Sequence, residues 1–209
     1  MRVLVIGGTG HIGTYLIPRL VRAGFDVVNL SRGESKPYTD LDVWAEVEQV
    51  VADRTEREAD GTFSDTVAAQ RPDVVVDLVC FTLDSAQSLV DGLRGRVGHL
   101  LHCGSVWRYG PSLKLPIREG EGSPPADEYG IQKDRIARML IAETAATGFA
   151  TTSVHPGHIV GPGWAPIGPL GNASLAQWRP ISAGHTVEVP GSGAELMHHV
   201  HADDVAQLF

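Results

Sequence analysis

A glycine-rich segment near the N-terminus constrains the fold more than any other part of the sequence. The continuous apolar run Val3–Ile6 leads directly into Gly7–Gly13, which reads GGTGHIG, and apolar residues then recur at helical spacing as far as Gly24. Such an apolar run is typical of a strand buried on both faces of a parallel sheet. The second apolar run, Val27–Leu30, completes a strand–helix–strand unit, so the sequence predicts an α/β fold.

Three glycines of that segment have distinct expected roles. Gly7 allows a tight turn, Gly10 lets the backbone approach a bound phosphate closely, and Gly13 lets the helix pack against the strand. The unpaired N–H groups and the positive end of the helix dipole then attract phosphate groups. Because the segment follows a strand and opens a helix, it predicts a dinucleotide-binding site.

The residues after the second strand indicate which dinucleotide binds. An acidic residue there would hold the ribose 2′-hydroxyl of NAD, whereas an arginine accommodates the 2′-phosphate of NADP. The sequence has Ser31 and Arg32 at this point, and the next carboxylate is Glu34. NADP is therefore the predicted cofactor, with NAD as the alternative.

Strand and helix patterns alternate through the first 156 residues. The expected strands lie within Trp44–Asp53 and at Val74–Val79, His99–Cys103 and Thr151–His155, and the expected helices are Ser64–Gln70 (capped by Ser64), Leu83–Leu93 and Asp127–Thr147. This alternation predicts a doubly wound parallel sheet, a Rossmann fold, over residues 1–156. Residues 157–209 are predicted to form a partial substrate-binding region interleaved with it, with irregular loops over 157–193.

Charge and hydropathy exclude several classes of partner. The net charge is −8 and no block of Lys and Arg occurs, so no nucleic-acid partner is predicted. No apolar run approaches the length of a membrane span, and the N-terminal run is too short for a signal peptide. Cys80 and Cys103 are expected to be buried thiols, with a disulfide between them as the alternative. These features predict a cytoplasmic protein.

Tyr129 and Lys133 stand four residues apart in the longest predicted helix, which places them on one face. A nearby ammonium favours the phenolate and lowers the pKa of a tyrosine. Such a tyrosine can exchange a proton with a hydroxyl or carbonyl group near neutral pH. The pair therefore predicts acid–base chemistry, although this spacing alone also occurs in ordinary surface helices.

Further segments accompany this pair in a set order. They are Gly7–Gly13, Asp53 after the third strand, Cys103–Gly110 (CGSVWRYG), His155–Pro162 (HPGHIVGP) and His201–Ala206 (HADDVA). In this set, which runs from Arg2 to Phe209, the chain resembles the short-chain dehydrogenase/reductase superfamily, specifically its extended branch of NAD(P)-dependent epimerases and dehydratases. The resemblance implies hydride transfer at a secondary alcohol or ketone, with sugars and nucleotide sugars among the substrates.

The resemblance also implies a role for individual residues. Tyr129 would be the acid–base group, Lys133 its electrostatic partner and ribose anchor, and Ser105 the hydrogen-bond partner of the reacting oxygen. The implied cofactor contacts are Gly7, Thr9, Gly10, His11, Ile12, Gly13, Ser31, Arg32, Asp53, Arg54, Val79, Cys80, Tyr129, Lys133, Pro156 and His158. The implied substrate contacts are Ser105, Val106 and His158. A homodimer through the helices Leu83–Leu93 and Asp127–Thr147 is expected by the same resemblance.

The sequence departs from the family pattern at several positions. Asp77–Cys80 (DLVC) replaces the usual His-x-Ala, and His158 stands where nucleotide-sugar enzymes commonly have Asn. The run Glu195–His199 lacks the Arg that usually binds a substrate diphosphate, which weakens the case for a nucleotide sugar. Members of the branch continue well past this length, so the substrate region is expected to be truncated.

The sequence leaves two alternatives to this interpretation. His198, His199 and His201, together with Asp203 and Asp204, form a group of metal-binding residue types, but their spacing matches no zinc motif and no metal is predicted. The alternative function is a non-catalytic relative that binds NADP as a sensor or scaffold, or that binds RNA, because a fold does not determine a function.

Overall fold

The computed structural model describes residues 1–111, 116–170, 174–189, 191–193 and 197–209. Glu195 and Leu196, which belong to the run without the expected arginine, lie outside the described residues. No helix in the described part of the chain is long and apolar enough to cross a membrane.

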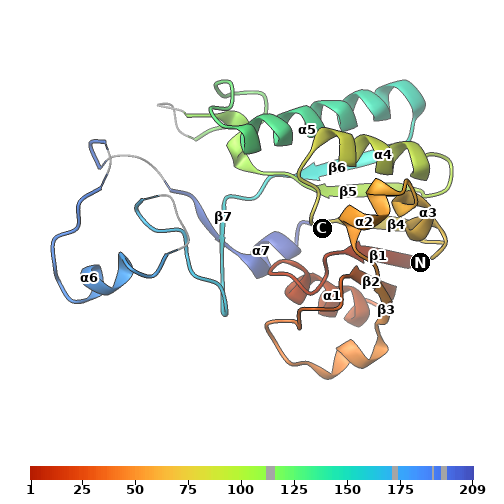
Figure 1. Cartoon of the computed structure of the whole chain (residues 1–209), viewed down its shortest axis with the longest axis horizontal. Helices are drawn as coiled ribbons and strands as arrows, with labels where there is room; N and C mark the ends of the chain where they lie inside the picture. Colours follow the sequence, from red (N-terminus) through yellow and green to blue (C-terminus); the bar gives the residue numbers. More distant parts are fainter. Residues whose placement is uncertain (112–115, 171–173, 190, 194–196) are drawn as a thin grey trace.

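A six-stranded parallel sheet forms the centre of the molecule, with the strand order β3-β2-β1-β4-β5-β6 (Figure 1). The strands are β1 (Arg2–Ile6), β2 (Asp26–Ser31), β3 (Glu48–Val51), β4 (Val74–Asp77), β5 (His99–Cys103) and β6 (Ala150–Val154). The chain leaves β1 in one direction along the sheet and returns to the other side of β1 with β4. This order confirms the predicted doubly wound Rossmann fold, whose ligand crevice lies where the strand order reverses.

Helices cover both faces of this sheet (Figure 1). They are α1 (Gly13–Arg22), α2 (Arg54–Ala59), α3 (Phe63–Ala68), α4 (Leu83–Leu93) and α5 (Glu128–Thr147), with short 3-10 helices at η1 (Asp42–Glu46) and η2 (Val106–Tyr109). In strand β1, the four residues after Arg2 are all apolar because both faces of the strand are buried. Leu4 and Ile6 belong to the core under α3, α4 and α5, whereas Val3 and Val5 belong to the core under α1.

The C-terminal region contains more regular structure than the sequence analysis predicted. β7 (His158–Val160) pairs in parallel with β8 (His199–His201), and α6 (Trp178–Ser182) lies between them in the sequence. The helix α7 (Ala202–Ala206) follows β8 directly. The prediction of irregular loops over 157–193 was therefore wrong at β7 and α6. Three-residue strands carry too little periodicity to be recognised, and β7 acquires its hydrogen bonds only from a distant segment.

The C-terminal region is anchored on α1. Nε and Nη2 of Arg19 donate to the two carboxylate oxygens of Asp203, at 2.9 and 2.8 Å. The rings of Tyr15 and His201 also meet edge-on, with their centres 5.3 Å apart. Val205 of α7 is 1% exposed and joins the core under α1. In Figure 1, α7 accordingly lies beside α1, whereas α6 lies well away from the sheet.

Several predicted boundaries need correction. The helix expected at Ser64–Gln70 is α3, which begins at Phe63, and its N-cap residue is Thr62 rather than Ser64. The preceding helix α2 was not predicted. Its N-cap is Asp53, whose carboxylate accepts hydrogen bonds from the backbone N–H groups of Thr55 and Glu56. β4 ends at Asp77, before the predicted end, because the chain turns there to reach α4.

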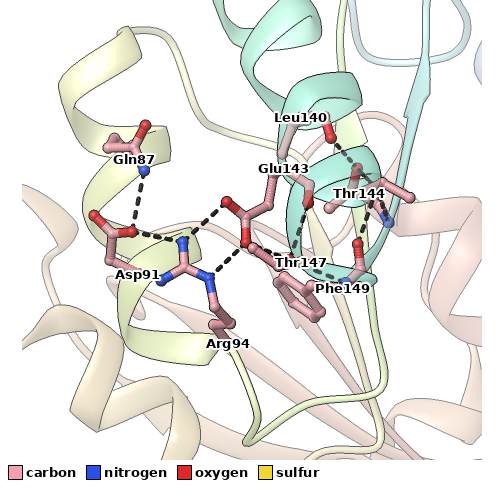
Figure 2. Close-up of polar contacts among 9 residues, drawn as sticks. Gln87, Asp91, Arg94, Leu140, Glu143, Thr144, Thr147 and Phe149 are labelled. Carbon is pink, nitrogen blue, oxygen red and sulfur yellow. Dashed lines mark hydrogen bonds and ion pairs between the residues drawn. The ribbon is translucent and has the colours of Figure 1, made fainter.

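Helices α4 and α5 pack side by side and are joined at one end by polar contacts (Figure 2). Nε and Nη2 of Arg94 donate to the two carboxylate oxygens of Glu143 at 2.6 and 2.9 Å, and Nη2 also reaches Asp91 at 2.8 Å. On α5, Ile136 is buried, whereas Ile141 is 65% exposed. The exposed positions of α5 are a mixture of charged residues, threonines and alanines, together with Tyr129 and Ile141.

Candidate functional site

The glycine turn forms a backbone cradle that excludes larger side chains. Gly7 adopts φ +81°, and a Cβ atom there would lie 2.6 Å from Cγ1 of Val79. A Cβ atom on Gly13 would lie 2.2 Å from the carbonyl oxygen of Gly8, so no side chain fits at that position. Gly10 donates its N–H to the carbonyl of Gly7 at 3.0 Å, which closes the turn. These contacts match the requirements of a phosphate-binding turn at a helix N-terminus.

A cleft of about 540 Å³ opens beside this turn, at the carboxyl ends of the strands. Its volume suits a bound nucleotide, since ligand pockets commonly measure about 300–1,000 Å³. Eight of the predicted cofactor residues line it: Gly7, Thr9, Gly10, Ser31, Arg32, Asp53, Arg54 and Val79. Lining residues that the sequence analysis did not single out are Ile6, Leu30, Gly33, Glu34, Ser35, Tyr38, Ala52, Thr55, Glu58, Phe81, Thr82 and Ser85.

Arg32 lies at the rim of this cleft with its charge accessible. Its Nε is 3.5 Å from a carboxylate oxygen of Glu34, and both side chains are more than half exposed. Such an exposed ion pair is weak, because solvent screens it. Arg32 therefore can exchange Glu34 for a phosphate at small cost.

Arg54, by contrast, is committed to other protein groups. Its side chain is 13% exposed, and Nη1 donates to both carboxylate oxygens of the buried Asp77 at 2.9 Å. Its Nε donates to Glu58 at 2.7 Å and to Ser85 at 2.9 Å, and the guanidinium lies 4.9 Å from the ring centre of Phe63. This network explains the departure at Asp77 from the family's histidine, because the carboxylate neutralises a buried arginine.

Some predicted cofactor residues do not line the cleft. They are His11, Ile12, Gly13, Cys80, Tyr129, Lys133, Pro156 and His158. The ring of His11 is 3% exposed and packs 4.3 Å from that of Trp164, and Ile12 is 6% exposed in the core. Only the backbone of these two residues is available to a ligand. Burial, assisted by the nearby His201, lowers the pKa of His11 to about 4.

Ser105, Tyr129 and Lys133 come together at the end of β5. Ser105 follows this strand, and Tyr129 and Lys133 lie on the first two turns of α5, which Asp127 caps through the N–H of Gly130 at 2.7 Å. The hydroxyl of Ser105 lies near enough to that of Tyr129 to lower the pKa of the phenol. Lys133 is 1% exposed, and its Nζ lies 5.7 Å from the ring centre of Tyr129.

The ammonium of Lys133 is directed at the backbone rather than at the phenol. Nζ donates to the carbonyl oxygens of Cys80 and Cys103, at 2.7 Å each. Burial lowers the pKa of Lys133. Burial also raises the pKa of Tyr129, and the neighbouring hydroxyl of Ser105 offsets this only in part. The predicted lowering of the Tyr129 pKa by Lys133 is therefore not found, because the two groups make no direct hydrogen bond here.

Both cysteines are free and buried, so the predicted thiols are confirmed and the disulfide is not formed. Burial raises the pKa of Cys80 to about 12 and that of Cys103 to about 11. Neither thiol therefore ionises near neutral pH, and their contribution to the site is the pair of carbonyl oxygens that bind Lys133.

The segment after Ser105 faces the strand β7. Val106 donates its N–H to the buried Pro156 at 3.1 Å, and the ring of Trp107 meets that of His158 edge-on at 6.1 Å. Burial, together with the neighbouring His199, lowers the pKa of His158, so this imidazole is neutral at pH 7. Trp107 was not among the predicted residues. Its position two residues after Ser105 was the sequence feature that could have identified it as a candidate site residue.

The C-terminal histidines serve structural roles among the described residues. His201 caps α7 by accepting the N–H of Asp203 at 3.2 Å, and His199 contacts the carbonyl of Ile167 at 3.0 Å. Within the described ranges, no group of three or more His, Cys, Asp or Glu residues is arranged to hold a metal ion.

Comparison with curated proteins finds relatives that span this chain. It is 31% identical to 2′-dehydrokanamycin reductase of Streptomyces kanamyceticus, over 98% of this chain and 55% of that protein. It is 24% identical to chloroplast stem-loop binding protein of 41 kDa b of Arabidopsis thaliana, over 100% of this chain and 54% of that protein. The chain therefore spans about half the length of these two relatives.

Solved structures share the fold. UDP-glucose 4-epimerase of Thermotoga maritima with UDP-glucose superposes with a TM-score of 0.75 at 20% identity, over 99% of this chain and 71% of that chain. UDP-glucose 4-epimerase of Thermus thermophilus in complex with NAD gives a TM-score of 0.74 at 20% identity, over 99% and 72%. The family model described as NAD dependent epimerase/dehydratase family matches residues 3–209. Because this match covers nearly the whole chain, the resemblance found in the sequence is confirmed, and the chain belongs to the NAD dependent epimerase/dehydratase family.

Proposed function

We propose that this chain forms the cofactor-binding and catalytic part of an NADP-dependent enzyme that reduces a ketone to a secondary alcohol, or epimerises through such a step. The clustering of Ser105 and Tyr129 at the end of β5, next to the buried Lys133, carries the proposal. These groups stand at the same edge of the sheet as the glycine cradle. The reductase and epimerase names of the relatives support the same reaction class.

Tyr129 is the proposed acid. Because burial holds its pKa above the ordinary value, the phenol keeps its proton at neutral pH. A protonated phenol donates to a carbonyl oxygen as negative charge develops there, which is the proton step of a reduction. Ser105 then holds the same oxygen by a second hydrogen bond. A bound nicotinamide supplies the hydride for this chemistry.

Lys133 has the proposed role of supporting Tyr129 and the cofactor ribose. An ammonium has three donors, and two of them are used by Cys80 and Cys103. The third is available for a ribose hydroxyl. The two hydrogen bonds of the ammonium also tie together the segments that follow β4 and β5 beside Tyr129, so Lys133 supports the phenol by fixing its surroundings.

The cleft residues have proposed roles that follow its geometry. The cradle of Gly7, Thr9 and Gly10 takes the pyrophosphate, assisted by backbone N–H groups of His11 and Ile12. Ser31 and Arg32 take the 2′-phosphate of NADP, which is the basis for preferring NADP to NAD. Asp53, Arg54, Val79 and Cys80 lie along the adenosine and nicotinamide sides of the cofactor, and Val106, Pro156 and His158 lie on the substrate side.

Titration and turnover measurements test this proposal. We expect NADPH to bind at least about tenfold more tightly than NADH, and Arg32→Ala to remove most of that difference. Tyr129→Phe should keep the NADPH affinity and lose about 10²-fold or more in turnover of a ketone panel. Tyr15→Phe, on α1, is the matched control. Unchanged turnover in Tyr129→Phe would refute the assignment of the acid, and tighter binding of NADH would refute the role of Arg32.

Binding of structured RNA is the second candidate, favoured by the likeness to the stem-loop binding protein. The net charge of −8 opposes it, because phosphate backbones attract basic surfaces. Binding of an RNA stem-loop at 50 mM salt with no NADPH-dependent turnover would favour this candidate. A cytoplasmic location, a homodimer through α4 and α5, and a division near residue 156 stay predictions, and sedimentation velocity tests the dimer.

A further inference from the structure

Arg108 joins the segment that carries Ser105 to the helix that carries Tyr129. It lies in η2, three residues after Ser105, and its Nη2 donates to Asp134 of α5 at 2.9 Å. Both side chains of this ion pair are largely buried, with 13% and 14% exposed. Asp134 stands five residues after Tyr129 on the same helix. The ion pair therefore connects the two elements on which the proposed reacting groups lie.

Arg108 also contacts the residue that follows β6. Its Nη1 lies 3.1 Å from Nε2 of His155, and its guanidinium lies 5.2 Å from the ring centre of Tyr109. Burial, assisted by the positive charges of Arg108 and Lys133, lowers the pKa of His155 to about 4. This imidazole is therefore neutral at pH 7 and can accept a hydrogen bond from the guanidinium. The Arg108 side chain is thus fixed by contacts from α5, from the chain after β6 and from its own neighbour.

Ser105 is attached to η2 through both its side chain and its backbone. Its Oγ accepts the N–H of Trp107 at 3.3 Å, and its carbonyl oxygen accepts the N–H of Arg108 at 3.3 Å. A shift of η2 relative to α5 would therefore move the hydroxyl of Ser105 as well. Because this hydroxyl lies near enough to the phenol of Tyr129 to act on it, the position of η2 decides how the two groups meet.

Gly130 lets η2 and α5 approach each other closely. A Cβ atom there would lie 2.7 Å from the carbonyl oxygen of Trp107, so no side chain separates the two backbones. This contact limits how near the elements come, but individual van der Waals contacts are weak and have no preferred direction. The hydrogen bond from Arg108 to the carboxylate of Asp134 is stronger and directional, so it fixes where η2 lies along α5.

We propose that Arg108 is a positioning residue that fixes the hydroxyl of Ser105 against the phenol of Tyr129. Its own contacts lie away from the reacting groups, so it acts through Ser105 by holding η2 on α5. Reacting groups have to be held within about 0.5 Å of their working geometry, which requires supporting hydrogen bonds of this kind. This inference rests on the proposed function, in which Tyr129 and Ser105 bind the same substrate oxygen.

An NMR double-mutant cycle tests this role without a substrate. The probe is the full chain with carbon-13 at the Cζ atoms of its four tyrosines, and the signal lost in Tyr129→Phe identifies Tyr129. The chemical shift of this atom responds to the surroundings of the phenol oxygen. We expect Arg108→Gln to move the signal in the same direction as Ser105→Ala, by at least about half as much. Adding Arg108→Gln to Ser105→Ala should cause little further change, because effects that pass through one group do not add.

Arg138 provides the matched control, because it binds the same carboxylate. Its Nε donates to Asp134 at 2.6 Å, but it lies on α5 itself and its side chain is 74% exposed. Arg138→Gln should therefore leave the Tyr129 signal unchanged. Arg108→Lys keeps a positive charge opposite Asp134 and should restore most of the wild-type shift. Asp134→Asn removes the ion pair from the other side, and it replaces Arg108→Gln in the cycle where that variant does not fold by circular dichroism.

The outcomes separate this inference from the proposed function. An unmoved Tyr129 signal in a folded Arg108 variant overturns the positioning role, and so does a double variant in which the two changes add. With a ketone that the wild type reduces, Arg108→Gln should lower kcat about tenfold and keep KM within about twofold. A raised KM at constant kcat would also count against the role. Failure of the wild type to bind NADPH removes the proposed function itself, whatever the tyrosine signal shows.

Discussion

Replacing Asp77 by asparagine removes one charge of a buried ion pair without changing the side-chain shape. Asp77 is 1% exposed, and both of its carboxylate oxygens accept from Arg54. Breaking a buried pair by removing one partner costs about 3–5 kcal/mol. Glu58 still neutralises Arg54 in the variant, so we expect the lower end, about 3 kcal/mol. For a chain of this length the loss corresponds to a fall in Tm of roughly 6–12 °C.

Urea unfolding followed by circular dichroism measures this loss. The midpoint should fall while the m-value stays constant, because the native fold is kept. The control is Arg96→Ala, which removes the exposed ion pair with Asp65 and should cost less than about 1 kcal/mol. The double variant Asp77→Leu with Arg54→Met removes both charges and should recover most of the stability. A free energy of unfolding for Asp77→Asn equal to that of the control would refute the reasoning.

Three further predictions follow from the same structure. Gly13→Ala places a methyl group 2.2 Å from the carbonyl oxygen of Gly8, so it should abolish tight NADPH binding in a calorimetric titration, while Gly24→Ala, with open space around it, should not. The pKa of His11 is lowered to about 4, so the fold is most stable above pH 6.5, where this imidazole is neutral, and loses stability as the pH falls toward 4. His11→Phe should therefore flatten the pH dependence of the unfolding midpoint between about pH 6.5 and 4. An unchanged slope would contradict this assignment. Arg19→Ala should cost about 1 kcal/mol and increase proteolysis of the C-terminal region, because its ion pair with Asp203 is only partly buried; cleavage at the wild-type rate would exclude that anchor.

The sheet could be predicted from the sequence because its inner strands β1 and β4 contain continuous apolar runs and are followed by recognisable turns. β5 and α4 have the predicted bounds, since a buried strand and a helix capped by Thr82 both leave local signals. The short helix α2 was missed because its six residues, RTEREA, present no apolar face. Its cap, Asp53, was assigned only as a cofactor residue.

The sequence identified which residues belong to the candidate site, but it did not show which atoms those residues contact. The spacing of Tyr129 and Lys133 placed both on one helix face, yet the sequence could not show that carbonyls from two separate segments bind the ammonium. The same holds for Arg54, whose partners come from three different elements. Such contacts depend on distant parts of the chain meeting, and a local pattern carries no information on them.

Of the two carbonyl oxygens that hold Lys133, that of Cys103 lies at the end of β5 and that of Cys80 lies in the loop between β4 and α4. The ammonium therefore connects two loops through its hydrogen bonds, in addition to lying near the phenol of Tyr129. Any shorter or uncharged replacement leaves two buried acceptors without donors, and the loops that carry Phe81 and Ser105 lose their common tether. A Lys133 variant would therefore combine two effects: the two loops would no longer be held together, and the positive charge near Tyr129 would be lost. Only a variant that restores both hydrogen bonds can separate the two.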